Sequence, residues 1–275
     1  MTAPSVAAAI REALLTEHAR DKVMATRRLA RDWRLGRLAC VFDIAMPDEP
    51  GRPDAPELLA PRHMPKRRKG GSDRGRVALW HSLAHIEFVA IDLALDMVGR
   101  FGGEMNATFV GDFLQIAAEE AMHFALIDRH LRTMGSFYGA LPAHGGLWDA
   151  AHETRFDVTA RLAVVPMVLE ARGLDVTPAM LERVRDSGDQ SGAKILTRIL
   201  DDEIRHVRAG VKHFIAQAKQ AGHAPDSFWK SLVRQHFHGQ LKEPFNDSAR
   251  RSAGLSRDWY LSLVRLTNSG IPPIS

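Results

Sequence analysis

Cysteine is nearly absent from this sequence, because Cys40 is the only one among 275 residues. A single cysteine cannot form an internal disulfide, and it provides no cluster of thiolates for structural zinc or an iron–sulfur group. Its rarity suits a reducing compartment, and we expect a cytoplasmic protein. Any metal that the chain holds should therefore be bound by nitrogen and oxygen ligands, which suit iron or manganese.

Long apolar runs and period-two alternation are also missing. No run approaches the ~20 apolar residues that span a bilayer, so no membrane span is predicted. Arg11, Glu12 and Glu17 lie where a secretion signal would be apolar. Without alternation between apolar and polar residues, no β-strand is predicted. The composition, with 45% hydrophobic and 25% charged residues, is ordinary for a globular protein.

Positive charge is concentrated near the N-terminus. Residues 1–79 carry 16 Lys and Arg against 10 Asp and Glu, whereas the rest of the chain carries 21 against 23. The excess includes "RRLARDWRLGR" (27–37) and "KRRK" (66–69). A solvated helix face and a charged loop explain these runs, and an anionic partner such as RNA is the alternative. Aromatic residues are not interleaved with the run at 66–69, which disfavours nucleic acid.

Apolar periodicity predicts an all-α fold. Beyond a helical region at 5–38, the pattern and its glycine-rich breaks predict four long amphipathic helices, at 76–100, 106–134, 150–172 and 190–219. "RGLD" is expected to end the third of them. Thr177 as N-cap and Pro178 behind it then predict a short inserted helix.

Six of the 14 prolines lie in "MPDEPGRPDAPELLAPRHMP" (46–65). Because proline removes backbone donors and disfavours helix before it, we expect an extended arm on the surface rather than a linker. Pro225 onward predicts one or two shorter helices. The expected architecture is a single domain with three parts: the N-terminal basic helix and arm (1–75), a four-helix metal-binding bundle (76–220) and C-terminal helices (221–275).

Two Glu-x-x-His pairs carry the chemistry: Glu120 with His123, and Glu203 with His206. A spacing of three residues places both side chains on one helix face. Taken alone the pairs mean little, since 13 Glu and 13 His in this length give about 0.6 such pairs by chance. They are also preceded by acids, Glu119 and Asp202.

Equal intervals join two further glutamates to these pairs. Glu87 lies 33 residues before Glu120, and Glu170 lies 33 residues before Glu203. Two antiparallel helices joined by a short turn bring residues so spaced to one level, ~21 Å from the turn. The pattern is a duplicated unit, Glu–33–Glu–x–x–His, whose first copy begins at Glu87 and whose second begins at Glu170. Such a set matches a four-helix carboxylate site.

The glutamates interrupt apolar stripes that must face the core. A buried carboxylate without a partner is costly, and four of them balance the charge of two divalent ions. We therefore predict two metal ions, with iron first and manganese or a mixed iron–manganese pair as alternatives. The predicted ligands are Glu87, Glu120, His123, Glu170, Glu203 and His206.

Four further residues are predicted to support this centre. Glu119 and Asp202 are placed to accept a hydrogen bond from a metal-bound histidine on the facing helix. His130 and Arg172 are candidate pocket residues, although a structural histidine is the alternative reading of His130. Pro166, four residues before Glu170, should kink its helix.

The duplicated arrangement resembles the ferritin-like di-iron superfamily, which includes bacterioferritins, rubrerythrins and di-iron oxygenases. "HSLAHIEFVAIDLALD", "PAHGGLWDAA", "VPMVLEARGLDVTP" and "EPFNDSARRSAG" are similar to a bacterial ferritin-like family labelled domain of unknown function 455, over nearly the whole chain. The resemblance implies a ferritin-like four-helix bundle with additional N-terminal, inserted and C-terminal helices, and the six ligands. It supplies no substrate.

The leading functional hypothesis is an O2-activating oxidoreductase, a di-iron oxidase or monooxygenase, that acts on an unknown small organic substrate. The additional helices argue against a hollow storage shell, but non-enzymatic metal binding, storage or detoxification remains the alternative. Because the superfamily includes a tRNA hydroxylase, an RNA-modifying enzyme is a further one. No membrane partner is expected. The electron donor, the native metal and a homodimeric state are left open.

Overall fold

A computed structural model of the chain describes residues 3–64 and 72–268. The basic run at 66–69 and the C-terminal "SGIPPIS" lie outside the described residues. Within them the chain forms helices and only isolated β-bridges, which confirms the all-α class. None of these helices has the length and apolar character needed to cross a membrane. Contacts divide the chain into two compact units, Met1–Asp149 and Ala150–Ser275. That all 275 residues act as one domain therefore stays a prediction.

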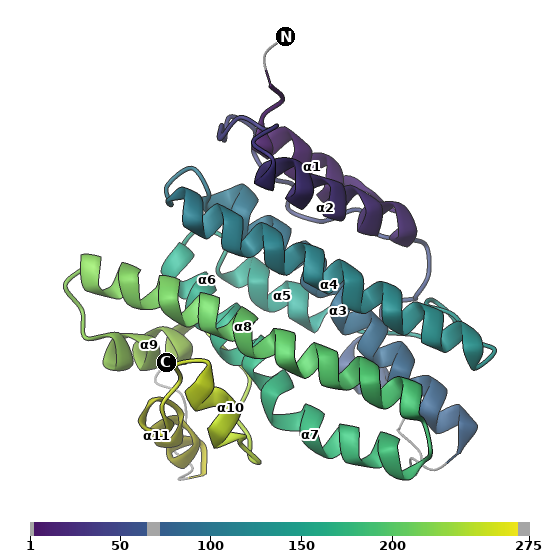
Figure 1. Cartoon of the computed structure of the whole chain (residues 1–275). Helices are drawn as coiled ribbons and strands as arrows, with labels where there is room; N and C mark the ends of the chain where they lie inside the picture. The colour runs from purple at the N-terminus through teal and green to yellow at the C-terminus, as the bar shows by residue number, and fades with distance from the viewer. Residues whose placement is uncertain (1–2, 65–71, 269–275) are drawn as a thin grey trace. The chain divides into compact units, whose positions relative to one another are not determined.

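The first unit is built on a pair of long helices, α3 (Asp73–Phe101) and α4 (Ala107–Thr133), which pack along each other (Figure 1). Asn106 caps α4, because its side chain accepts a hydrogen bond from Phe109 N. α1 (Val6–Leu15) packs on α3, and α2 (Ala19–Arg34) packs on α4. The region expected to be helical at 5–38 is thus two helices with a break at residues 16–18.

Residues 46–60 form the predicted extended arm, which lies within the first unit, and a short 3-10 turn, η1 (Pro61–His63), follows it. Backbone hydrogen bonds hold the arm at two points. Gly51 N donates to Leu14 O at 2.9 Å, and Leu59 N donates to Ala143 O at 2.8 Å. A Cβ at Gly51 would lie 2.3 Å from Leu15 O, so only glycine permits this approach.

Lys22 joins α2, the arm and α3 beneath the surface. Its side chain is fully buried, and the ammonium donates to Leu14 O (3.1 Å), Gly51 O (2.8 Å) and Asp92 Oδ1 (2.5 Å). All three ammonium protons thus have acceptors, as a buried charge requires. Burial raises the pKa of Asp92 to about 6 although Lys22 opposes the shift, and burial lowers the pKa of Lys22.

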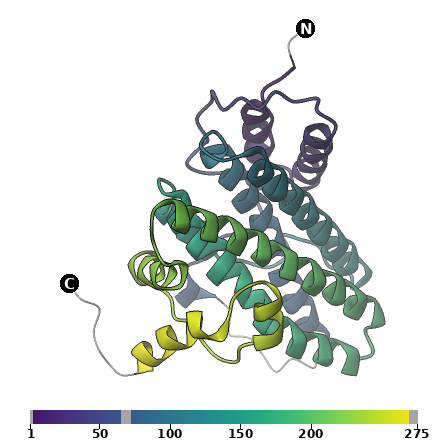
Figure 2. The same ribbon diagram turned by 60° about the vertical axis from the view of Figure 1, so that its left-hand side comes forward.

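The second unit also contains a helix pair. α8 (Gln190–Gln220) packs along α7 (Ala171–Asp186), and α6 (Val158–Val164) continues into α7 through a π-helical turn, η2 (Val165–Glu170) (Figure 2). α5 (Gly146–Glu153) crosses the boundary between the two units. Three C-terminal helices follow, where one or two were expected: α9 (Pro225–His236), α10 (Asp247–Ser252) and α11 (Arg257–Asn268).

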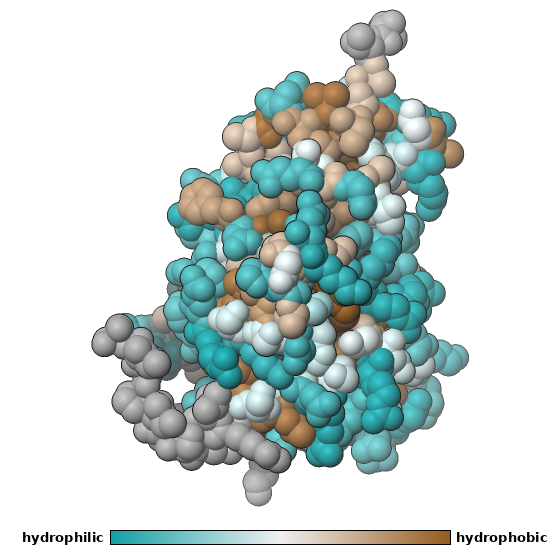
Figure 3. Space-filling model, turned by 90° about the vertical axis from the view of Figure 1, so that its left-hand side faces the viewer, coloured by the Kyte–Doolittle hydropathy of each residue, from teal (hydrophilic) through white to brown (hydrophobic). Residues whose placement is uncertain are grey.

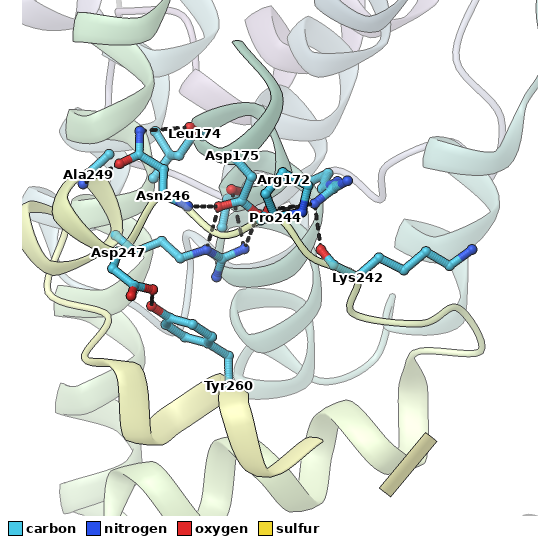
Figure 4. A network of polar contacts seen from close by, with 11 residues as sticks. Arg172, Leu174, Asp175, Lys242, Pro244, Asn246, Asp247, Ala249 and Tyr260 are labelled. Carbon is cyan, nitrogen blue, oxygen red and sulfur yellow. Dashed lines mark hydrogen bonds and ion pairs between the residues drawn. The ribbon is translucent and has the colours of Figure 1, made fainter. Parts of the chain in front are cut away.

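The predicted helix break at "RGLD" is wrong, and so is the separate inserted helix. α7 continues through "RGLD" and through the predicted start of the inserted helix, so that Thr177 and Pro178 lie in its interior. Proline at 178 cannot donate to the carbonyl of Leu174, but Asn246 Nδ2 donates to that oxygen at 3.1 Å. Figure 4 shows Asn246 reaching both Leu174 and Asp175. A side chain from the C-terminal segment therefore replaces the hydrogen bond that the proline removes.

A buried ion pair anchors the same C-terminal segment on α7. Arg250 donates through Nε to Asp175 Oδ1 (2.8 Å) and through Nη2 to Asp175 Oδ2 (2.7 Å), and both side chains are almost inaccessible. The Arg250 guanidinium lies over the rings of Phe245 and Tyr260, 5.0 Å and 4.7 Å from their centroids. The bidentate geometry fixes α10 against α7.

Hydrophobic residues are mostly inside. The face drawn in Figure 3 is largely hydrophilic, with brown apolar residues in small separate groups. The largest fully buried side chains include Trp80, Trp229 and Phe214, which belong to the helices described above.

Candidate metal centre

Two acids and a histidine converge between α3 and α4. His123 Nδ1 lies 3.2 Å from Glu87 Oε2 and 3.3 Å from Glu120 Oε2. One ligand atom from each of the three residues lies within 4.8 Å of the others, and all three side chains are buried. This buried group could hold a metal ion, and its one nitrogen and two carboxylates suit a transition metal of the iron or manganese type.

The helices explain this convergence. Glu87 precedes the end of α3 by about four helical turns, and Glu120 follows the start of α4 by nearly the same length. Because the two helices pack along each other, equal distances from the turn bring the glutamates to one level. His123 then follows Glu120 by just under one helical turn, on the same face.

Burial makes the acids of this group hard to ionise without a cation. Desolvation raises the pKa of Glu87 well above its ordinary value of 4.5, and the neighbouring Glu120 raises it further, while His123 opposes the shift. A divalent ion would replace the proton that the pair otherwise retains. The electrostatics of the group therefore favour a bound cation.

The second unit holds the other half of the predicted set. Glu203 and His206 lie on α8, where both are buried, and His206 Nδ1 lies 3.7 Å from Glu203 Oε1. Glu170 is the last residue of η2 and is half-buried. Each unit thus carries one Glu–33–Glu–x–x–His set, on a pair of helices that pack along each other. That the six residues bind metal together stays a prediction.

The π-helical turn lies at the kink predicted from Pro166, and Pro166 itself packs on α8. A Cβ built on Gly210 would lie 2.4 Å from Pro166 Cβ, so the two helices approach closely only because residue 210 is glycine. π-helical turns often occur at functional sites, and here the turn ends on Glu170.

Gly210→Ala should lower the free energy of unfolding by about 1–3 kcal/mol, the usual cost of overpacking a core. The added methyl group must push η2 away from α8. Urea titration of the metal-free chain measures the change. Gly173→Ala, on α7, is the matched control, because its Cβ would meet nothing within 4 Å. An unchanged midpoint for Gly210→Ala would show that η2 is not held by this contact.

The predicted supporting acids differ in their surroundings. Asp202 is buried, and Arg198 Nε donates to its Oδ2 at 2.6 Å while Arg205 Nη2 donates to its Oδ1. Glu119 Oε1 accepts a hydrogen bond from Gln115 Nε2 at 3.0 Å. These contacts lie within single helices, so the predicted hydrogen bonds to the histidines of the facing helix stay predictions.

The two candidate pocket residues also have defined neighbours. His130 is buried edge-on against Trp80, with ring centroids 4.5 Å apart. Arg172 is half-buried, and its Nη1 donates to the carbonyls of Lys242 (2.6 Å) and Pro244 (3.2 Å), as Figure 4 shows. Their roles at a substrate pocket stay predictions.

The histidines beside Glu87 are structural. His85 Nε2 donates to His144 O at 3.1 Å, and its Nδ1 then accepts the hydroxyl proton of Tyr138 at 3.0 Å. Burial lowers the pKa of His85 to about 4, so the ring is neutral. His81 Nε2 accepts from Gly139 N at 3.0 Å. Both rings therefore bind the loop that follows α4 and do not contribute to the group around Glu87.

Sequence reasoning missed two buried acids on α3, Asp92 and Asp96. Asp92 pairs with Lys22, and Asp96 Oδ1 accepts from Arg100 Nε at 2.7 Å. Both acids interrupt the apolar run after Glu87, as the predicted ligands interrupt their own stripes. A carboxylate on an apolar helix face is therefore a signal that Asp92 and Asp96 share with the predicted ligands. The difference is that the two aspartates pair with basic side chains, whereas Glu87 and Glu120 lie beside each other and His123.

Comparison with known proteins places the chain in a family. A family described as "Protein of unknown function (DUF455)" matches residues 15–261. An uncharacterized protein of Haemophilus influenzae is 39% identical over 229 residues, which cover 80% of this chain and 79% of that protein. No solved structure matches. The match runs from the last residue of α1 into α11 and includes both predicted ligand sets, and the chain belongs to the DUF455 family.

Proposed function

We propose that Glu87, Glu120, His123, Glu170, Glu203 and His206 together hold two metal ions, iron foremost, and that the protein is an O2-activating oxidoreductase. The observation that carries the proposal is the buried convergence of Glu87, Glu120 and His123. The sequence repeats the same intervals in the second unit, beginning at Glu170. Two sets with four carboxylates and two imidazoles balance the charge of two divalent ions.

A di-iron pair bound by these ligands would supply electrons to O2 and the oxidising power for an organic substrate. The chain contributes the rest. The carboxylates would bind the ions and offset their positive charge, while the histidines would provide neutral nitrogen ligands. His123 must give up any proton on Nδ1 before that atom can bind a metal. The apolar side chains around the ligands exclude water from the group.

The proposal is tested by anaerobic loading with Fe(II). We expect two Fe(II) per chain, followed by O2 uptake when air is admitted. Glu120→Ala combined with His206→Ala should reduce the bound iron to below one per chain, because one ligand is lost from each set. Elemental analysis after desalting gives the stoichiometry, and an oxygen electrode gives the uptake.

Other results would favour other functions. Binding of many ions per chain by a large multi-subunit particle in size-exclusion chromatography would indicate storage. Metal content unchanged in the double variant would indicate that these six residues form a helical scaffold without a metal centre. Either outcome contradicts the proposal.

A further inference from the structure

The exposed face of α2 carries a row of arginines, the arginine stripe. Its members are all exposed: Arg20, Arg27, Arg28, Arg31 and Arg34. Since each helical residue turns by about 100° and rises by about 1.5 Å, these five lie within about 120° of one another and extend over about 21 Å. The buried residues of α2 lie on its other side: Lys22, Val23, Thr26, Leu29 and Ala30. The stripe therefore faces the outside of the first unit.

Acids do not balance the arginine stripe. Asp32 lies 3.5 Å from Arg31 and 3.1 Å from Arg37, and Asp21 lies 3.4 Å from His18. Within the part of the chain that the structure describes, the other four arginines of the stripe form no ion pair with an acid. Arginines three or four positions apart on a helix repel each other, and the helix dipole favours only the two in the last turn. The stripe has an excess of positive charge that an acidic partner would neutralise.

Exposed apolar side chains accompany the arginines. Met24 lies within the stripe and is 54% exposed, and Leu35, the C-cap of α2, is 53% exposed. Five of the nine exposed large apolar side chains of the described residues belong to this short region of the chain: Leu15, Met24, Leu35, Val41 and Ile44. Protein–protein interfaces are enriched in arginine and methionine and depleted of lysine, and the exposed residues of α2 include no lysine. This composition favours a protein as the partner.

Other anionic partners fit the stripe less well. Proteins also contact nucleic-acid phosphates through hydroxyl and amide side chains, but the exposed residues of α2 include none, and the exposed Asp21 beside the stripe would repel phosphates. An interfacial helix buries its apolar face in a membrane, whereas the apolar face of α2 packs on α1 and α4. A second copy docked through the same face would bring arginines against arginines.

We propose that the arginine stripe, together with Met24 and Leu35, binds an acidic peptide segment of another protein, in which apolar side chains are interspersed among carboxylates. The guanidinium groups would pair with the carboxylates through parallel hydrogen bonds, and the apolar side chains would cover Met24 and Leu35. α2 packs on α4, which carries Glu120 and His123 (Figure 1). α2 would therefore separate the bound segment from the helix that carries these two predicted ligands.

The test is fluorescence anisotropy of two labelled peptides of equal length, titrated with the full chain in EDTA. One peptide consists of glutamate alone, and in the other a tyrosine replaces every fourth glutamate. We expect the glutamate–tyrosine peptide to bind about tenfold more tightly although it carries less charge, because burial of its rings on Met24 and Leu35 adds to the charge pairing. Single-stranded RNA of equal length and phosphatidylglycerol vesicles should bind more weakly than this peptide.

Two double variants separate the two contributions. Arg27→Gln with Arg34→Gln should weaken binding of both peptides about fivefold, as expected for the loss of two exposed charge pairs. Met24→Ser with Leu35→Ser should remove the preference for the glutamate–tyrosine peptide and leave binding of the glutamate peptide unchanged. All four side chains are exposed, so both variants should keep the Tm of the natural protein.

Arg183→Gln with Arg185→Gln is the matched control, because both arginines are exposed on α7. It should bind both peptides like the natural protein. Tighter binding of the glutamate peptide, of RNA or of the vesicles than of the glutamate–tyrosine peptide would overturn the proposal, as would binding that Arg27→Gln with Arg34→Gln leaves unchanged. A dimer in size-exclusion chromatography that dissociates in this arginine variant would also overturn it, because a second copy of the chain would then occupy the stripe.

Discussion

Glu120→Gln is expected to remove most of the stabilisation that Fe(II) or Mn(II) gives the protein, while the metal-free chain becomes no less stable. Amide for carboxylate keeps the shape of the buried side chain but removes a charge that opposes ionisation of Glu87. Loss of a residue that only hydrogen-bonds to a metal ligand weakens metal binding by up to about 100-fold. Loss of a ligand itself should weaken it by at least as much. At 1000 times the natural Kd, metal stabilisation would fall from about 4 to about 1.4 kcal/mol.

The metal-free protein should also lose stability as the pH rises. Because the pKa of Glu87 is raised in the folded chain, its contribution to stability is fully present below its ordinary pKa of 4.5 and is lost as pH rises toward the raised value. Glu120→Gln removes one of the causes of that shift, so its unfolding free energy should depend less on pH. Urea titrations at pH 5 and pH 8, with EDTA and with Mn(II), measure both effects.

Glu104→Ala is the matched control, because Glu104 is exposed between α3 and α4. It should keep the full metal-induced stabilisation. If Glu120→Gln retained that stabilisation as well, Glu120 would not be a ligand, and the convergence with Glu87 and His123 would be a structural hydrogen-bond group.

That Glu87 and Glu120 lie together could be predicted because their spacing is a property of the chain alone. The interval from Glu87 to Glu120 is read directly from the sequence, and α3 and α4 convert it into spatial proximity, since the two glutamates lie at nearly equal distances from the turn between the helices. Long amphipathic helices are also the elements that apolar periodicity predicts best. The helices predicted at 76–100, 106–134 and 190–219 accordingly agree with α3, α4 and α8 to within three residues at each end.

The path of the chain around Glu170 could not be predicted, because residues distant in the sequence determine it. Glycine at 173 and proline at 178 are local signals for ending a helix, but α7 continues because distant residues support it. Asn246, the N-cap of α10, donates to the Leu174 carbonyl, and Arg250 of α10 donates to Asp175. Such tertiary contacts override the local preference to end the helix, and they cannot be predicted from the local sequence.

Lys22→Met is expected to lower the unfolding free energy of the protein by about 3–5 kcal/mol at pH 8, the usual cost of removing one partner from a buried ion pair. The change leaves Asp92 buried without its cation. It also removes the donor to Gly51 O, whereas Leu14 O keeps its hydrogen bond from Gly51 N. Urea titration measures the loss, and Arg27→Met, exposed on the same helix α2, is the matched control.

The pH dependence of the Lys22→Met effect distinguishes loss of the ion pair with Asp92 from simple loss of packing. In the natural chain the pKa of Asp92 is about 6, raised by burial and held down by Lys22. Without Lys22 that pKa rises further, so the variant continues to lose stability above pH 6, where the natural chain no longer does. The difference between Lys22→Met and the natural protein should therefore grow from pH 6 to pH 8.

Asp92→Leu should show the reverse trend. Burial lowers the pKa of Lys22 and Asp92 opposes that shift, so removing the carboxylate lowers the pKa further. A base whose pKa is lowered by folding costs stability when the pH is low enough to protonate it in the unfolded chain. The destabilisation relative to the natural protein should hence be larger at pH 6 than at pH 9.

The double variant Lys22→Met with Asp92→Leu should be less destabilised than either single variant. Apolar residues of similar volume often replace a buried pair at little cost or with a gain, because both desolvation penalties disappear together. The pH dependence that each single variant introduces should vanish as well. If the two single effects were instead additive, Lys22 and Asp92 would not interact, and the arm and α2 would be held to α3 by packing and backbone hydrogen bonds alone.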